Sequence, residues 1–269
     1  MASELTGRQY PIYRASDGKV VSDSVVIPEL GPHDVVLRIT HSGVCYTDFE
    51  FFKHNAPLAL GHEGVGIVEA VGSAVTTLKV GDRAGGGFHN DSCGNCRYCL
   101  SGQDIYCPQR VIFGAGGYNN GTFGAYFIGK EGFVHKIPDS MSSEDAAPLQ
   151  CAGATVYSAL TETVKPRDRV GIIGIGGLGH LAIQFAAKMG AEVVVFSTSK
   201  SKEKEALGFG ASEFVLLSEP ETIKAPVDVL ILTGSKYPDW DKVLVGKVLA
   251  RRGTVVPLAA PTHGPLSLP

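Results

Sequence analysis

Six cysteines and one histidine are spaced in ways that suit metal binding. Four of the cysteines form the run Cys93-Gly-Asn-Cys96-Arg-Tyr-Cys99, followed by Cys107. Short turns let successive thiolates point at one centre, and four thiolates satisfy the tetrahedral coordination of zinc without leaving an open position, so such a zinc ion would be structural. Free or oxidised surface cysteines and an iron–sulfur cluster are the alternatives. The crowding of the cysteines disfavours the first, and the sequence has no electron-transfer context for the second.

The remaining two cysteines, Cys45 and Cys151, lie on either side of His62 in the sequence. Two cysteines and one histidine are a known set of ligands for catalytic zinc, with the fourth position left for water or substrate. Their spacing alone does not decide their role. Two small buried cysteines and a satisfied core histidine are an equally good interpretation.

A glycine-rich turn follows an apolar run that begins at Val170. Gly174, Gly176 and Gly179 fit the pattern G-x-G-x-x-G, with Gly177 and Leu178 between them. In this pattern the first glycine permits a tight turn, the second admits a pyrophosphate, and the third lets helix pack on strand. The strand, turn and helix context favours dinucleotide binding by these residues over a merely structural glycine cluster.

The residues about 20 positions further on decide between the two nicotinamide cofactors, because an acidic residue there binds the ribose hydroxyls of NAD. This chain has Ser197, Thr198, Ser199 and Lys200 instead. Hydroxyls and a cation suit a 2′-phosphate, so the sequence predicts a preference for NADP(H) over NAD(H). The alternative is that Ser197 and Ser199 only cap the next helix, and both interpretations can hold together.

The elements that must position these residues differ between the two parts of the chain. Short β-like runs such as 35–40 and 64–71 occupy the first part, where long helical periodicity is nearly absent. After a helical stretch at 152–164, strand and helix patterns alternate, which predicts a doubly wound parallel sheet. The predicted strands cover residues 170–174, 192–197, 214–217, 227–233 and 253–258, and the predicted helices cover 178–189, 200–207 and 240–250. We therefore expect an α/β protein with a β-rich domain at 1–154 and a dinucleotide-binding domain at 155–269.

Composition limits the possible partners. The chain has 269 residues, a formal charge of -3 and no basic tract, which argues against nucleic acid as a partner. No stretch approaches the ~20 apolar residues of a membrane helix, and the N-terminus lacks the apolar core of a secretory signal. We expect no membrane partner and a cytoplasmic location.

Several motifs together resemble one enzyme family. They are Gly43-Val-Cys45-Tyr-Thr47-Asp48, Gly61-His62-Glu63-Gly-Val-Gly66, the four-cysteine run, Cys151-Ala-Gly-Ala-Thr155 and Gly174-Ile-Gly-Gly-Leu-Gly179. From about residue 8 onwards the chain is similar to zinc-dependent alcohol dehydrogenases of the medium-chain dehydrogenase/reductase family, in the cinnamyl-alcohol-dehydrogenase and yeast-type branches. The resemblance implies a GroES-like catalytic domain, a Rossmann domain for NADP(H), and two zinc ions per chain.

The resemblance also implies a role for each site residue. Cys45, His62 and Cys151 would hold the catalytic zinc with Glu63 beside it, and the four-cysteine run would hold the structural zinc. Asp48 would orient His62, and Thr47 would accept the proton of the alcohol. Hydride would pass between NADP(H) and a small-molecule alcohol or aldehyde.

Two departures from the family pattern modify these expectations. Glu50 stands where many relatives have a relay histidine. His54 is a possible substitute, although an exposed loop histidine is the commoner interpretation. The chain also ends at His263-Gly-Pro-Leu-Ser-Leu-Pro269 after five predicted strands, whereas a full sheet has six. Relatives use the sixth strand to form a homo-oligomer and then complete the catalytic domain. The ending predicts a truncated Rossmann domain, and the alternative function is a catalytically inactive zinc-binding remnant.

Overall fold

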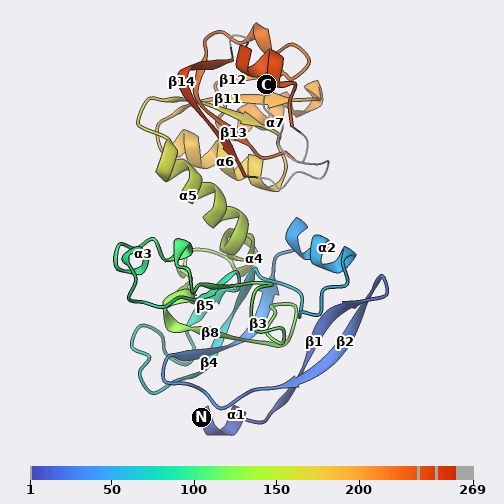
Figure 1. The fold of residues 1–269 in the computed structure, drawn as a ribbon, viewed down its shortest axis with the longest axis vertical. Helices are drawn as coiled ribbons and strands as arrows, with labels where there is room; N and C mark the ends of the chain where they lie inside the picture. The colour runs from blue at the N-terminus through green and yellow to red at the C-terminus, as the bar shows by residue number, and fades with distance from the viewer. Residues whose placement is uncertain (1, 235–236, 246–247, 259–269) are drawn as a thin grey trace. The chain divides into compact units, whose positions relative to one another are not determined.

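The computed structural model describes residues 2–234, 237–245 and 248–258 (Figure 1). The chain divides into two compact units, Met1–Cys151 and Ala152–Pro269. The boundary predicted from the sequence lies three residues further along the chain.

The N-terminal unit is built on an antiparallel sheet of five strands in the order β8-β3-β4-β5-β9. The two longest are β3 (Asp34–Ser42) and β4 (Gly64–Val71), which correspond to the predicted runs 35–40 and 64–71. The other strands are β5 (Arg83–Gly86), β8 (Tyr126–Lys130) and β9 (His135–Lys136). Buried side chains on β3, β4 and β8 form one of the unit's cores, which contains Val35, Leu37, Val68 and Phe127.

Smaller elements surround this sheet. A hairpin of β1 (Gln9–Ser16) and β2 (Lys19–Val26) forms the long two-stranded ribbon drawn in blue in Figure 1. The other pieces are β6 (His89–Asp91), β7 (Val111–Ile112), α1 (Ala2–Leu5), α2 (Tyr46–Lys53), α3 (Arg97–Leu100), α4 (Ser143–Pro148), the 3-10 turns Asp104–Tyr106 and Glu131–Phe133, and a π-helical turn Leu149–Gly153. Many short elements joined by loops are what the sequence of this unit predicts.

The C-terminal unit contains the predicted parallel sheet, in the order β12-β11-β10-β13-β14. Its strands are β10 (Arg169–Ile173), β11 (Glu192–Ser197), β12 (Glu213–Leu216), β13 (Val227–Leu232) and β14 (Leu249–Pro257). The helices are α5 (Ala154–Thr163), α6 (Gly177–Lys188) and α7 (Glu203–Gly208), with 3-10 turns at Lys200–Lys202 and Pro220–Thr222. The predicted α/β fold class is confirmed.

Both faces of this sheet are buried, which explains why its strands are apolar along their whole length. Alternate residues of β10 and β11, such as Ile172 and Val195, pack with α5, α6 and α7 in one core cluster. Their neighbours Ile173 and Phe196 pack in a second cluster that also contains Trp240. The sheet therefore separates two cores, as a doubly wound architecture requires.

Two predicted helices differ from the structure. The helix expected at 240–250 is wrong at its C-terminal end, because a π-helical turn covers Asp241–Val245 but β14 has already begun at Leu249. Leu249 pairs with Val227 and contacts the second core cluster, so sheet pairing overrides the local helical pattern. The helix expected at 200–207 is a 3-10 turn followed by α7. The predicted ending at 263–269 lies outside the described residues.

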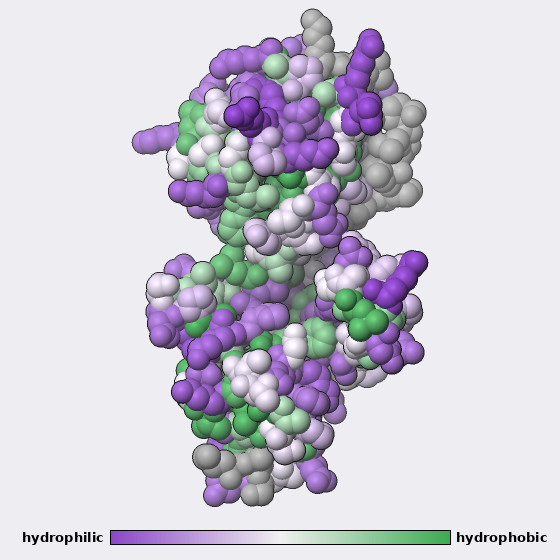
Figure 2. Space-filling view, turned by 90° about the vertical axis from the view of Figure 1, so that its left-hand side faces the viewer, coloured by the Kyte–Doolittle hydropathy of each residue, from purple (hydrophilic) through white to green (hydrophobic). Residues whose placement is uncertain are grey.

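None of the helices in the described part of the chain has the length and apolarity needed to cross a membrane. On the face drawn in Figure 2, hydrophilic and hydrophobic residues lie intermixed over both units. The scattered apolar side chains that this view contains are normal for a protein surface.

Candidate metal centres and cofactor turn

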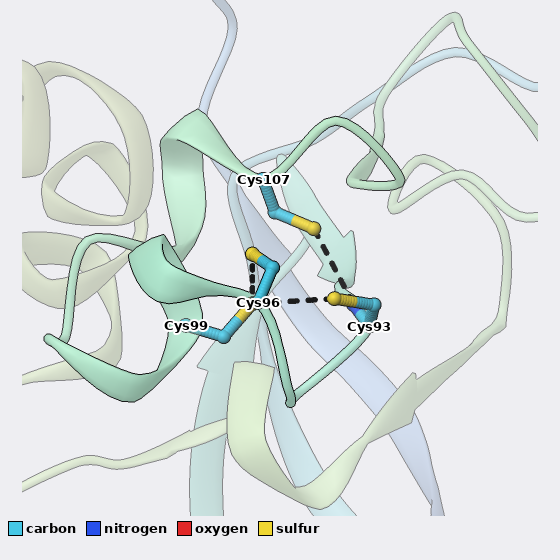
Figure 3. Close-up of side chains that lie close together, drawn as sticks. All are labelled: Cys93, Cys96, Cys99 and Cys107. Carbon is cyan, nitrogen blue, oxygen red and sulfur yellow. Dashed lines mark hydrogen bonds between the residues drawn. The ribbon is translucent and has the colours of Figure 1, made fainter.

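The four sulfur atoms of the predicted structural site lie together in the N-terminal unit (Figure 3). The Sγ atom of Cys99 is 3.5 Å from that of Cys96 and 3.9 Å from that of Cys93. Four sulfurs at about 2.3 Å from one zinc ion would be about 3.8 Å apart in a tetrahedron. Because all four cysteines are free thiols at this spacing, the donor set fits a closed tetrahedral zinc site.

Local turns explain how this cluster forms. Cys96 is the N-cap of the short helix α3, so Cys96 and Cys99 are three residues apart on one helical face. Cys107 follows the 3-10 turn Asp104–Tyr106, and its sulfur accepts hydrogen bonds from the N–H groups of Cys93 (3.5 Å) and Gln109 (3.3 Å). A hydrogen bond from the Asn95 N–H contributes most to lowering the pKa of Cys93, to about 6, which favours the thiolate that a metal needs.

The second cluster joins residues from distant parts of the same unit. Ligand atoms of Cys45, His62, Glu63 and Cys151 all lie within 4.8 Å of one another. Cys45 is the N-cap of α2, His62 and Glu63 precede β4, and Cys151 lies in the π-helical turn. His62 and Glu63 are buried, whereas the two cysteines are half-buried. The structure thus brings these four side chains together in one cluster, as a shared metal site would require.

Asp48 fixes the orientation of His62. Its Oδ1 atom lies 3.0 Å from Nδ1 of His62 and also accepts a hydrogen bond from the Gly61 N–H at 3.0 Å, while its Oδ2 accepts one from the Cys45 N–H at 3.1 Å. Because a carboxylate only accepts, Nδ1 carries a proton, and in the neutral ring Nε2 is left with a lone pair. Nε2 is buried and has no hydrogen-bond partner among the described residues. A metal ion between the sulfurs would give this buried nitrogen the partner that it lacks.

The charges in this cluster also favour a cation. A hydrogen bond with Cys151 contributes most to lowering the pKa of Cys45, to about 3, and the same contact raises the pKa of Cys151. Burial, together with the Cys45 charge, raises the pKa of Glu63 to about 7. Burial opposes a charge on His62, but hydrogen bonding to Asp48 and the proximity of Cys45 raise its pKa to about 9. Buried acidic groups that repel one another in this way are typical of a site built around a divalent ion.

In the C-terminal unit the glycine-rich turn joins β10 to α6. Gly174 has a φ of +101°, a conformation that favours glycine. A side chain at Gly179 would collide with the Gly174 carbonyl and lie 2.9 Å from Oγ1 of Thr233, so the helix packs tightly on the turn. At Gly176 and Gly177 no atom lies within 4 Å of the position a side chain would take. The turn therefore has a closed side, formed by Gly174 and Gly179, and an open side with room for a phosphate group.

The end of β11 lies beside this turn, because the Gly174 N–H donates to the Phe196 carbonyl at 3.0 Å. Ser197 is buried, Thr198 is exposed, and Ser199 caps the 3-10 turn by accepting the Ser201 N–H at 3.3 Å. The predicted capping role of Ser199 is thus confirmed. Lys200 is exposed and its Nζ atom contacts Glu203 at 2.8 Å. Thr198, Ser199 and Lys200 thus expose hydroxyl groups and a cation just after a strand end that contacts the turn at Gly174.

Comparisons with known proteins identify the family. Residues 31–139 match the alcohol dehydrogenase GroES-like domain. The chain is 41% identical to probable formaldehyde dehydrogenase AdhA of Bacillus subtilis, over 94% of this chain and 77% of that protein. It is 38% identical to NADP-dependent alcohol dehydrogenase C 1 of Mycolicibacterium smegmatis, over 89% of this chain and 72% of that protein. A solved cinnamyl alcohol dehydrogenase from Sorghum bicolor, SbCAD4, superposes with a TM-score of 0.86 at 33% identity, covering 97% of this chain and 79% of its own.

The chain belongs to the zinc-dependent alcohol dehydrogenases of the medium-chain dehydrogenase/reductase family. In this alcohol dehydrogenase, Thr47 lies next to the mixed cluster, because its N–H lies 3.5 Å from the Cys45 sulfur. Glu50 and His54 lie at the far end of α2, where Glu50 contacts Lys53 at 3.2 Å and His54 at 3.7 Å. His54 is 76% exposed, which agrees with its interpretation as a surface histidine.

Three residues that the sequence did not single out support the mixed cluster and the glycine-rich turn of this alcohol dehydrogenase. Phe113 and Phe88 hold the His62 ring, with ring centroids 4.7 and 5.7 Å away. Thr233 follows β13, and its hydroxyl donates to the carbonyls of Ile173 and Gly174 at 2.9 and 3.0 Å. The two aromatic residues carry no sequence signal. Thr233 has one, since it is the last residue of the strand predicted at 227–233 in the same parallel sheet as β10.

Proposed function

We propose that this alcohol dehydrogenase binds zinc through Cys45, His62 and Cys151 and transfers hydride between NADP(H) and a small-molecule alcohol or aldehyde. The observation that carries the proposal is the buried Nε2 atom of His62, which has no partner among the described residues and lies close to the two sulfurs. The chemistry that zinc supplies in a site of this kind is Lewis acidity toward an alcohol or carbonyl oxygen. NADP(H) supplies or accepts the hydride.

The residues of the chain would bind, orient and move protons. Asp48 keeps the proton on Nδ1 of His62, so that Nε2 stays available to the metal. Glu63 lies beside the ligands, where its carboxyl group can balance the charge of the site. Thr47 is the second residue of α2 and interacts with Cys45. Its hydroxyl is our candidate for taking the proton from the alcohol, as a general base that passes it outward.

A second zinc ion would occupy the closed site of Cys93, Cys96, Cys99 and Cys107. Two sulfur–sulfur distances of 3.5 and 3.9 Å, with all four sulfurs within 4.8 Å of one another, support this assignment. Four thiolate ligands leave no position for substrate, so this ion would stabilise its loop and take no part in the reaction.

We propose NADP(H) as the preferred cofactor, bound with its pyrophosphate on residues 174–179. Ser197, Thr198, Ser199 and Lys200 offer hydroxyls and a cation at the end of β11, and none of these four side chains is acidic. A 2′-phosphate would gain charge-assisted hydrogen bonds there. The relative from Mycolicibacterium smegmatis is named as NADP-dependent, which supports the same choice. As in related enzymes, we expect the active form to be a homo-oligomer.

Elemental analysis of the purified protein, combined with NADPH oxidation by a panel of aliphatic and aromatic aldehydes, tests the proposed activity. We expect about two zinc ions per chain in the wild type and about one in Cys151→Ala, with loss of aldehyde reduction. A zinc content near one that Cys151→Ala leaves unchanged would contradict the catalytic site. Circular dichroism of the variant controls for misfolding.

Equilibrium titration with NADPH and NADH tests the cofactor preference. We expect NADPH to bind about 10- to 100-fold more tightly than NADH, which is the range for a charged hydrogen bond. Lys200→Ala should reduce this difference in affinity. Lys202→Ala is the matched control, because Lys202 pairs with Glu205 in the same i,i+3 geometry as Lys200 with Glu203. Equal affinities of the wild type for the two nucleotides would contradict the preference.

A further inference from the structure

The carbonyl oxygen of Gly176, in the middle of the glycine-rich turn, has two hydrogen-bond donors on one residue. The backbone N–H of His180 lies 3.0 Å from it, as expected in the first turn of α6. The Nδ1 atom of the His180 ring lies 3.1 Å from the same oxygen. Because a carbonyl oxygen only accepts, Nδ1 must carry the ring proton in this contact.

These two hydrogen bonds also fix the next N–H group along the chain. The peptide bond between Gly176 and Gly177 is planar, and the C=O and N–H groups of a trans peptide point in opposite directions. When the Gly176 carbonyl is held against the helix, the Gly177 N–H must point away from it, out of the helix N-terminus. Gly177 is the first residue of α6, so its N–H is one of the groups available to an anion there.

Little else restrains this peptide. Gly176 and Gly177 have open space where side chains would be, and no side chain of the described residues caps this end of α6. Glycine on both sides of a peptide bond leaves it more conformational freedom than any other pair of residues. The peptide at Gly174, in contrast, is already held by the hydroxyl of Thr233. His180 restrains the peptide between Gly176 and Gly177 as Thr233 restrains the peptide at Gly174.

The His180 ring is itself held in place. Its centroid lies 5.8 Å from that of Phe209, the C-cap residue of α7, and the rings are tilted by 55°. Phe209 packs against the core cluster formed by α5, α6 and one face of the sheet. The His180 ring thus lies between the glycine-rich turn and the side chain of Phe209, which packs against the core.

We propose that His180 is a positioning residue for cofactor binding: it pins the Gly176 carbonyl and so aims the Gly177 N–H at the pyrophosphate of a nicotinamide dinucleotide. This inference rests on the proposed binding of the cofactor at residues 174–179. It does not depend on the choice between NADP(H) and NAD(H), because both contain the pyrophosphate. The contribution of His180 must therefore be the same for both nucleotides, unlike that of Lys200.

Equilibrium titration of three variants with NADPH and with NADH tests this role. His180→Ala should weaken the binding of both nucleotides by the same factor, about 2- to 12-fold, which is the range for one hydrogen bond. His180→Gln should restore most of the affinity, since a glutamine in this helix already makes the equivalent bond: Nε2 of Gln184 donates to the His180 carbonyl at 3.0 Å. Gln184→Ala is the matched control, because it removes the same kind of bond one turn further from the cofactor.

A second measurement reads the peptide directly in the protein without nucleotide. The amide resonance of Gly177 in a ¹H–¹⁵N spectrum should shift in His180→Ala and return towards its original position in His180→Gln. This readout also shows whether the variant is folded, because the resonances of β12 and β13 should stay in place.

Four results would overturn the inference. The first is an unchanged affinity in His180→Ala, and the second is an equal loss in His180→Ala and His180→Gln. The third is a loss that affects NADPH alone, which would place His180 with Lys200 at the 2′-phosphate. A wild type that binds neither nucleotide would overturn both this inference and the cofactor proposal. Equal affinity of the wild type for NADPH and NADH would refute the proposed preference, but a common loss in His180→Ala would still support the inference.

Discussion

The two cysteine-containing clusters of the N-terminal unit are assembled in different ways. The four-cysteine cluster lies within residues 93–107. Short turns bring its three half-buried cysteines next to the buried Cys107. The mixed cluster gathers side chains from the start of α2, the segment before β4 and the turn after α4, and its histidine and glutamate are buried. A local loop needs only its own turns to form a site, whereas the mixed cluster needs the whole folded unit. The two clusters should therefore lose metal independently.

The largest effect is expected at the mixed cluster. His62→Ala should reduce aldehyde reduction by at least about 10²- to 10³-fold, because the reacting oxygen loses its electrostatic stabilisation when the metal is lost. Zinc content should fall from about two ions per chain to about one, measured by elemental analysis. His41→Ala is the control, since His41 is a partly exposed histidine whose carboxylate partner is Glu144 at 3.6 Å. Loss of both ions in His62→Ala would contradict the independence of the two clusters.

The next effect concerns stability and belongs to the local cluster. Closing a loop of about 15 residues stabilises a fold by about 3 kcal/mol, so Cys107→Ser should lower the melting temperature by about 6–12 °C. A chelator should destabilise the wild type by a similar amount at this site and have a smaller effect on the variant. Thermal unfolding of the wild type and the variant, each with and without chelator, measures the effect of the substitution and the effect of the chelator.

Cys107 is buried, so its replacement by serine also buries a hydroxyl group. Cys99→Ser avoids this problem because Cys99 is half-buried, and it should cause a similar loss. If the chelator leaves the melting temperature of the wild type unchanged, the loop is stable without metal and the comparison between the clusters fails.

Asp48→Asn should produce a smaller effect that is confined to the mixed cluster. An amide can still reach Nδ1 of His62, but it lacks the charge that keeps the proton there, so zinc should bind about 10- to 100-fold more weakly. Competition with a chromophoric chelator measures the affinity of the two sites separately. Equal weakening at the four-cysteine site would mean that the substitution loosens the whole unit.

The smallest effect tests a contact outside both clusters. Glu131 accepts hydrogen bonds from the N–H groups of Thr76 (2.7 Å) and Thr77 (2.6 Å), and these bonds, that from Thr77 first, lower its pKa to about 2. A lowered folded-state pKa means that its stabilisation is complete above the ordinary pKa of 4.5 and is lost as the pH falls towards 2. The melting temperatures of the wild type and Glu131→Gln should thus differ most at about pH 6 and converge only as the pH approaches about 2. A difference that does not change with pH would contradict this account.

Strong local patterns allowed the best predictions of the fold. The run 64–71 and the strand 192–197 match β4 and β11 residue for residue, because branched apolar side chains in a short segment favour a strand wherever it packs. The helix predicted at 240–250 failed at its C-terminal end because Leu249 pairs with Val227, a contact that no local pattern contains. The helix α2 was not predicted, although the Cys45 to Asp48 capping box that begins it is visible in hindsight.

The sequence by itself determined the donor set of the four-cysteine loop and the conformation of the glycine-rich turn. Both lie within short segments, where the reach of each residue limits the chain to a few arrangements. It also suggested Cys45, His62 and Cys151, but their pattern fitted a core equally well until the resemblance to a family was added.

Only the tertiary structure decided how these residues are arranged. It placed Cys45 and Cys151, which are about a hundred residues apart, around a buried Nε2 atom, and it brought Thr233 to the glycine-rich turn. The physical reason is that spacing along the chain no longer limits the distance between residues so far apart. Their positions depend on sheet pairing and core packing, and the protonation state of each site depends on the burial that this packing creates.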